Sequence, residues 1–141
     1  MEDKFDRFEK MDELLTGMME ADYDACSQLA SFFVTYDLGF LSGKSGARQI
    51  ARNWGHDEML QFLLEWYVKE KEGYDDVLLK DVVKRIEDAG DDPAKVLEEY
   101  INSYDPSVIR QEDARQFLAE MGVDELCKTI IFSYMKVRKI L

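Results

Sequence analysis

The sequence has little proline, cysteine and histidine, and each shortage narrows what the protein can be. Only two prolines occur in 141 residues, and no run rich in glycine or serine interrupts the chain. Because an architecture of many short strands needs frequent turn residues, this scarcity favours long helices. The two cysteines, Cys26 and Cys127, form no CxxC pair, and with a single histidine they are too few for a zinc site. We expect both thiols to be reduced and buried.

Positive charge and long apolar runs are scarce as well. The chain has 18 Lys and Arg against 30 Asp and Glu, a net charge of −12. This surplus opposes direct binding to nucleic acid or to an anionic membrane. The least charged stretch, Ala25 to Gly43, contains several polar residues and Asp37, so no membrane span is expected. The charged N-terminus has no targeting segment, and we therefore expect a cytoplasmic protein.

The residues that are present are sufficient to build a folded core. Apolar residues make up 46% of the chain and aromatic residues 12%, too much for a disordered acidic segment. A length of 141 residues is typical of one compact unit. We expect a single domain over residues 1–141.

Two distant segments share one pattern. Residues 47–64 read ARQIARNWGHDEMLQFLL and residues 114–131 read ARQFLAEMGVDELCKTII, at an offset of 67. Each segment has apolar positions at helical spacing on both sides of a glycine, which is the expected left-handed end of a first helix. Ala21 lies 34 residues before Gly55 and Gly90 lies 35 residues after it, which is about half of the offset of 67. The pattern predicts four units of two helices each.

The predicted fold class is therefore all-α, an array of about four antiparallel helical hairpins that stack as a repeat solenoid. Caps such as Asp92-Pro93 mark helix starts. The predicted helices cover residues 3–19, 22–36, 46–53, 56–72, 74–89, 92–103, 106 or 111–120, and 123–139.

The segment GKSGARQIARNWGHDEMLQFLLE, residues 43–65, resembles an ankyrin repeat of the bacterial kind. His56 matches the histidine that follows glycine in that family. Residues 110–131 resemble it in part, with Val123 in place of the histidine, and the T-P-L-H opening is absent. The resemblance implies an ankyrin-like or degenerate helical repeat array that presents a surface to a protein partner.

No residue pattern points to catalysis, a cofactor or a metal. The segment from Gly39 to Ser45 has three residues where a P-loop needs four before its Gly-Lys. The lone His56 is expected to bond nearby backbone and fix the turn. No run of acidic residues has the alternating spacing of a Ca²⁺ loop. We therefore expect a protein that is not an enzyme.

The distribution of charge indicates where a partner binds. Residues 1–24 and 71–105 are strongly acidic, whereas residues 126–141 carry only basic charges. The acidic regions are either solvated faces that confer solubility or a surface for a basic partner. Tyrosines near the connections between hairpins add residues of the kind found at interface hot spots. The candidate partner-binding residues are Asp75, Asp76, Asp88, Asp91, Asp92, Glu98, Glu99, Tyr67, Tyr74 and Tyr104.

These features predict a non-enzymatic protein–protein interaction module. The sharpest version is a small acidic inhibitor or immunity-type protein, from a phage or a bacterium, that blocks a basic enzyme acting on nucleic acid. Two alternatives stay open: a structural or scaffold subunit of a larger assembly, and an enzyme whose carboxylates converge only in the fold. A homodimer through the exposed face of a terminal hairpin also stays open.

Overall fold

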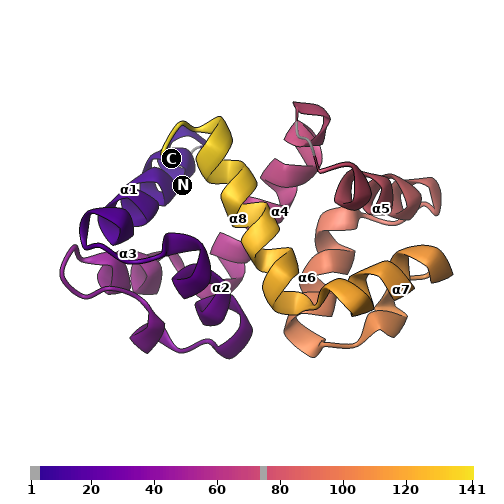
Figure 1. Ribbon diagram of the computed structural model, residues 1–141, viewed down its shortest axis with the longest axis horizontal. Helices are drawn as coiled ribbons and strands as arrows, with labels where there is room; N and C mark the ends of the chain where they lie inside the picture. The colour runs from indigo at the N-terminus through magenta and orange to yellow at the C-terminus, as the bar shows by residue number, and fades with distance from the viewer. Residues whose placement is uncertain (1–3, 74–75) are drawn as a thin grey trace.

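The computed structural model of the chain describes residues 4–73 and 76–141, and most of them are helical (Figure 1). Across these two ranges there are eight α-helices, three short 3₁₀ turns and no β-strand. The α-helices are α1 (Lys4–Glu20), α2 (Ala25–Thr35), α3 (Ala47–Trp54), α4 (His56–Glu70), α5 (Val77–Asp88), α6 (Pro93–Ser103), α7 (Glu112–Met121) and α8 (Val123–Val137). The 3₁₀ turns are η1 (Leu38–Phe40), η2 (Lys71–Gly73) and η3 (Pro106–Val108). The prediction of an all-α protein is confirmed.

Capping side chains explain where several helices begin. Asp24 accepts a hydrogen bond from the backbone N–H of Ser27, so α2 starts at residue 25 rather than at 22 as predicted. Asp92 caps α6 in the same way, with proline in the first turn as the sequence indicates. The two starts predicted for the seventh helix belong to separate elements, because residues 106–108 form η3 and α7 begins at Glu112.

Single glycines join two pairs of consecutive helices. Gly55 lies between α3 and α4, and Gly122 lies between α7 and α8. Their φ angles of 94° and 86° are positive, but their ψ angles of 144° and 155° are extended. Both glycines were expected to end the first helix in the left-handed conformation, and this prediction is wrong because their ψ angles are extended. Only glycine adopts this backbone region without strain, so one residue ends one helix and starts the next.

The segment from α2 to α4 and the segment from α6 to α8 share their local structure. Tyr36 and Tyr104 both end a helix in the left-handed conformation, with φ of 63° and 59°. Arg48 and Arg115 each donate Nε–H to a carbonyl oxygen of the preceding loop, at 2.7 and 2.9 Å. Corresponding residues are 68 apart up to this loop and 67 apart after it, because the first loop is one residue longer.

The correspondence extends to α1 and α5. Four buried positions match at the offset of 68, namely Met11 with Leu79, Leu14 with Val82, Leu15 with Val83, and Met18 with Ile86. Helix α5 begins at Val77, whose counterpart in α1 is Glu9. Residues 4–8 of α1 therefore extend beyond the part that α5 matches.

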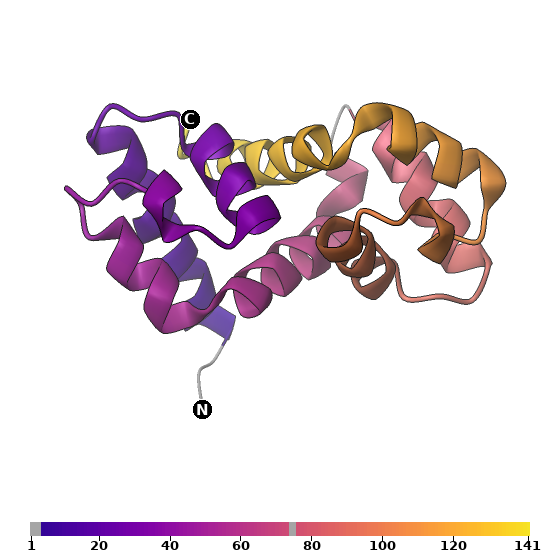
Figure 2. The ribbon, with the colours of Figure 1, turned by 90° about the horizontal axis from the view of Figure 1, so that it is seen from below.

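The two halves pack reciprocally around α4 and α8, which cross at the centre of the molecule (Figure 1) and lie one above the other in Figure 2. The most extensive contact joins α2 to α8, and the next joins α6 to α4. Helices α1 and α3 lie at one end and α5 and α7 at the other, so an approximate twofold axis, vertical in Figure 1, relates the halves. The predicted linear stack of hairpins does not bring its first pair of helices into contact with its last pair, whereas here α2 packs on α8.

The core joins aromatic side chains from both ends of the chain. The ring of Phe8 in α1 lies 5.1 Å from that of Phe62 in α4, and the ring of Tyr134 in α8 lies 4.8 Å from that of Trp66. Such edge-to-face contacts add to the gain from apolar burial. The helices are amphipathic rather than apolar throughout, and in the described ranges none is long and apolar enough to cross a bilayer.

The two cysteines are free thiols in packed surroundings. Cys127 is buried, whereas Cys26 is half-buried with its sulfur 3.6 Å from that of Met135. Burial raises the pKa of Cys26 to about 11 and that of Cys127 to about 12. Because the thiolate is the reactive form, neither sulfur is a nucleophile at neutral pH.

Candidate partner-binding surface

Several of the predicted carboxylates have structural roles. Asp76 caps α5 and also accepts a hydrogen bond from the hydroxyl of Tyr67 at 2.8 Å. Asp91 forms an ion pair with Arg110, with Oδ2 3.2 Å from Nε, and Asp92 caps α6. Each of these three carboxylates therefore already has a hydrogen-bond donor or a cationic partner within the protein.

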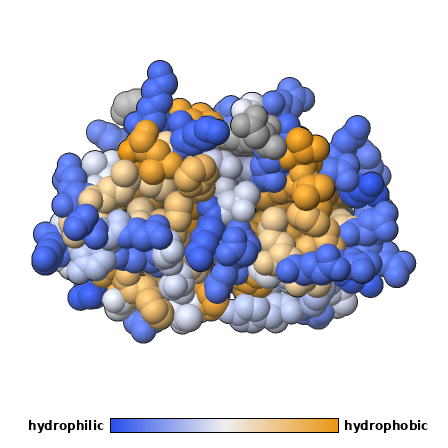
Figure 3. Space-filling model, viewed as in Figure 1, coloured by the Kyte–Doolittle hydropathy of each residue, from blue (hydrophilic) through white to orange (hydrophobic). Residues whose placement is uncertain are grey.

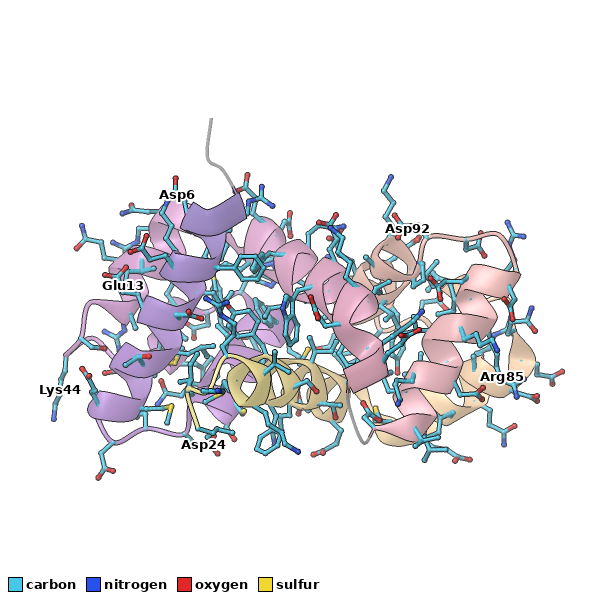
Figure 4. The ribbon with its side chains drawn as sticks, turned by 90° about the horizontal axis from the view of Figure 1, so that it is seen from above. Asp6, Glu13, Asp24, Lys44, Arg85 and Asp92 are labelled. Atoms are coloured by element: carbon cyan, nitrogen blue, oxygen red, sulfur yellow. The ribbon has the colours of Figure 1, made fainter. Side chains whose placement is uncertain are left out.

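The other predicted residues divide into exposed, buried and undescribed positions. Asp88 and Glu99 are exposed at opposite ends of the α5–α6 pair. Tyr67 is fully buried, so the expectation that it contacts a partner is wrong: it follows Leu60 by seven residues and lies on the same buried face of α4. Tyr74 and Asp75 lie outside the described residues. Charged side chains such as Asp6, Glu13 and Arg85 project outward around the molecule (Figure 4).

Glu98 is the predicted carboxylate with the most unusual surroundings. It is half-buried on α6, which packs against α4. Burial raises the pKa of Glu98, and the negative charges of Asp57 and Glu65 raise it further. His56 and Lys95 act in the opposite direction, yet among the described residues no hydrogen bond or ion pair holds the Glu98 carboxylate. The fold thus keeps Glu98 near two other acids, and among the described residues only Asp57 of the three has a direct partner that can carry positive charge, His56, whose Nδ1 lies 3.1 Å from Oδ1 of Asp57.

His56 connects this acidic group to the end of α2. Its Nε2 lies 2.7 Å from the carbonyl oxygen of Phe33, and its ring stacks on that of Tyr36 at a centroid distance of 3.8 Å. The expected bond to backbone is present, but it reaches a residue 23 positions away rather than a neighbour. His56 therefore follows Gly55 at the start of α4 and also holds α4 against the end of α2.

Two exposed tyrosines lie near the end of α2: Tyr36 is close to Asp57 and Glu98, whereas the acid closest in effect to Tyr104 is Asp124 of α8. Tyr36 and Tyr104 are 53% and 52% exposed, and the hydroxyl of Tyr104 lies 3.5 Å from the carbonyl oxygen of Val34. Burial raises the pKa of both phenols, as do nearby acids, including Asp57 for Tyr36. Both hydroxyls therefore stay protonated at neutral pH.

We call this region the acidic–tyrosine surface, formed by Tyr36, Asp57, Glu65, Glu98 and Tyr104. The sequence prediction named Glu98 and Tyr104 but missed the others. Tyr36 had a signal in the sequence, since the dipeptides Tyr36-Asp37 and Tyr104-Asp105 recur at the offset of 68.

Among the described residues, hollows lie beside both central helices. A groove of about 790 Å³ lies along α8, lined among others by Met19, Tyr23, Asp76, Phe132 and Leu141. A smaller hollow of about 210 Å³ lies between α1 and α4. Among the described residues no group of His, Cys, Asp or Glu is arranged to hold a metal ion.

We compared the chain with known protein families, curated proteins and solved structures, and none of them matches.

Proposed function

We propose that this protein is a non-enzymatic interaction module that binds a basic protein through the acidic–tyrosine surface. The observation that supports it best is Glu98, a half-buried carboxylate beside Asp57 and Glu65 that has no direct cationic partner among the described residues. Keeping like charges together costs stability in the free protein. A Lys or Arg side chain from a partner would supply the missing positive charge.

The tyrosines suit the same partner. An arginine that reaches Glu98 would pass close to the exposed ring of Tyr36, where cation–π contact adds to the ion pair. Tyrosine is also among the residues that contribute most at protein interfaces. The net charge of −12 would steer a basic partner towards the protein and speed association.

The sharpest form of the proposal is a small acidic inhibitor or immunity-type protein that blocks a basic enzyme acting on nucleic acid. Its support is the acidic excess, the small size and the presence of carboxylates next to aromatic rings, which offer a basic groove negative charge and stacking partners as nucleic acid does.

The repeat architecture belongs to the proposal as well. The matched caps, glycines and loop arginines support descent from a duplicated unit of α1 to α4, twice the length of the predicted hairpin repeat. The resemblance to ankyrin repeats falls on the segments in which one glycine joins two helices, α3 to α4 at Gly55 and α7 to α8 at Gly122. We propose this four-helix unit as the element that presents the binding surface.

A pull-down tests the proposal directly. The tagged protein is incubated with lysate at low salt, washed, eluted in steps of increasing salt and analysed by mass spectrometry. We expect a basic protein that handles nucleic acid, released by moderate salt. Glu98→Gln and Tyr104→Ala should each reduce its recovery. Glu120→Gln, an exposed carboxylate on α7, is the matched control and should leave recovery unchanged.

Other outcomes would contradict the proposal. An apolar partner that resists salt, or recovery of the protein alone, favours a scaffold subunit. Stabilisation by a metal ion or a nucleotide in a thermal-shift screen favours an enzyme, because a ligand that binds only the folded state raises its melting temperature.

A further inference from the structure

The two corresponding halves differ sharply in what they carry at the start of α5 and at the matching positions of α1. Val77 and Leu78 at the start of α5 are 67% and 63% exposed. Their counterparts in α1 are the charged residues Glu9 and Lys10. Figure 3 shows an apolar area over this start of α5 and a second over the C-terminal end of α8, separated by hydrophilic residues. One half is thus apolar where the other is charged.

The same difference occurs on α8 and before α2. Phe132 is 51% exposed, whereas its counterpart on α4 is Glu65. Tyr23 is 44% exposed, whereas its counterpart is Asp91. Both Phe132 and Tyr23 line the groove of about 790 Å³. Because the other half provides a charged alternative at each position, the fold does not require these apolar side chains, and clustered exposed apolar residues mark binding sites.

The other half also shows what kind of side chain fits in the groove along α8. On α4, the ring of Phe8 from the first turns of α1 packs against Phe62. The counterpart of Phe62 on α8 is Thr129, which lines the groove. The counterpart of Phe8 is Asp76, which caps α5 and also lines the groove. The groove therefore lacks the aromatic side chain that helix α1 supplies in the other half, and a helix with an aromatic side chain fits there.

The charged residues around the groove indicate which charge a bound helix would carry on its flanks. The groove is lined by three acids, Asp24, Asp76 and Glu125, and by two lysines, Lys128 and Lys136. Glu125 and Lys128 pair with each other at 3.8 Å. Hydrogen bonds from Ser27 lower the pKa of Asp24, which therefore stays ionised. A slight acidic excess, on a chain with a net charge of −12, favours a basic occupant.

We propose that the α8 groove binds an amphipathic helix of a partner protein that carries an aromatic anchor on its apolar face and an excess of basic residues on its flanks. The anchor contacts Phe132 and Thr129, and the methionines Met19 and Met135 provide an adaptable apolar lining. This groove shares no residue with the acidic–tyrosine surface, so the inference does not rest on the function proposed above.

A library of helical peptides displayed on phage tests the proposal with the full-length chain. The library varies 17-residue amphipathic sequences, and binding of the selected peptides is measured by fluorescence anisotropy. We expect selection of peptides with an aromatic anchor and basic flanks. Phe132→Glu, which introduces the residue found at the counterpart position, should weaken their binding by at least about tenfold. Phe40→Glu, at an exposed apolar residue outside the groove, is the matched control and should bind as the wild type does.

Three results would overturn the proposal. Selected peptides that bind Phe132→Glu as tightly as wild type would place the site elsewhere. Peptides with acidic flanks would refute the basic occupant. Self-association in sedimentation experiments that Phe132→Glu abolishes would make the groove an interface between copies of this chain. Glu98→Gln should leave peptide binding unchanged, so failure here is distinct from failure of the acidic–tyrosine surface.

Discussion

The hydroxyl of Tyr134 donates a hydrogen bond to Asp12 at 2.8 Å, and this bond joins the last helix to the first. Arg138 holds the same carboxylate, with Nη2 2.8 Å from Oδ2. At the corresponding position in the first half, Tyr67 donates to Asp76 at the start of α5. Each of the two central helices thus uses a tyrosine near its end to fasten the outer helix of the other half.

Replacing Tyr134 with phenylalanine should destabilise the protein. The ring would still pack, but Asp12 would lose a donor, and hydrogen bonds to charged groups contribute about 1.5–3 kcal/mol. Burial raises the pKa of Tyr134, so the native hydroxyl stays protonated over the whole accessible pH range. Urea unfolding of Tyr134→Phe measures the loss, with the exposed Tyr23→Phe as a control expected within about 0.5 kcal/mol of wild type. Equal stability would mean that the Asp12–Arg138 pair alone fastens α1.

Replacing Glu98 with glutamine should stabilise the protein at neutral pH. The pKa of Glu98 is raised in the folded state, so ionisation costs more there than in the unfolded chain. This cost is absent below the ordinary glutamate pKa of 4.5 and fully present above the raised folded value. Thermal unfolding across pH should therefore show a small gain for Glu98→Gln at pH 7 that disappears near pH 3. Glu99→Gln, at the exposed neighbouring residue, is the matched control, and a loss of stability in Glu98→Gln at pH 7 would contradict the account.

Replacing Ser45 with alanine should also stabilise the protein. The hydroxyl oxygen of Ser45 is buried without a hydrogen-bond partner among the described residues, and it packs closely against Gly17 of α1. Removing an unsatisfied buried polar group gains about 1 kcal/mol or more. Ser42 in the same loop is the matched control, because its hydroxyl accepts a hydrogen bond from the backbone N–H of Lys44. Denaturant unfolding should show opposite signs for Ser45→Ala and Ser42→Ala.

Cutting the chain between its halves should not separate them. A protease site inserted after Gly73 allows the full-length protein to be cleaved after it has folded. Because α2 packs on α8 and α6 packs on α4, we expect both fragments to elute together from a sizing column at an unchanged volume. They should separate only in denaturant. Separation in native buffer would show that the contacts between the halves are too weak to hold the fold.

The helices could be predicted from the sequence because their signals are local. The caps at Asp24 and Asp92, the glycines Gly55 and Gly122, and apolar residues at helical spacing all act within a few residues of the chain. The packing partners could not be predicted, because every helix has an apolar face and nothing local indicates which two faces meet. The contact between α2 and α8 depends on the whole fold.

The candidate site was predicted in part for the same reason. Glu98 and Tyr104 were named from charge and position, but the acids beside Glu98 come from α4, which only the fold brings near. The burial of Tyr67 could have been predicted, since it continues the stripe of Leu60, Leu63 and Leu64. The exposed Phe132 could have been noticed too, because its counterpart at the offset of 67 is Glu65.

The reciprocal packing of α2 on α8 also determines the order in which the protein can form during synthesis. Helix α2 is translated before α8, the helix that covers most of it, and five further helices lie between them in the chain. Until then its apolar face, with Leu29, Phe32 and Phe33, lacks its main cover. Contacts between residues so far apart in the chain slow folding, because a long loop must close first. This fold should therefore be completed only after α8 has been synthesised, and more slowly than in helical proteins whose neighbours in sequence are also neighbours in space.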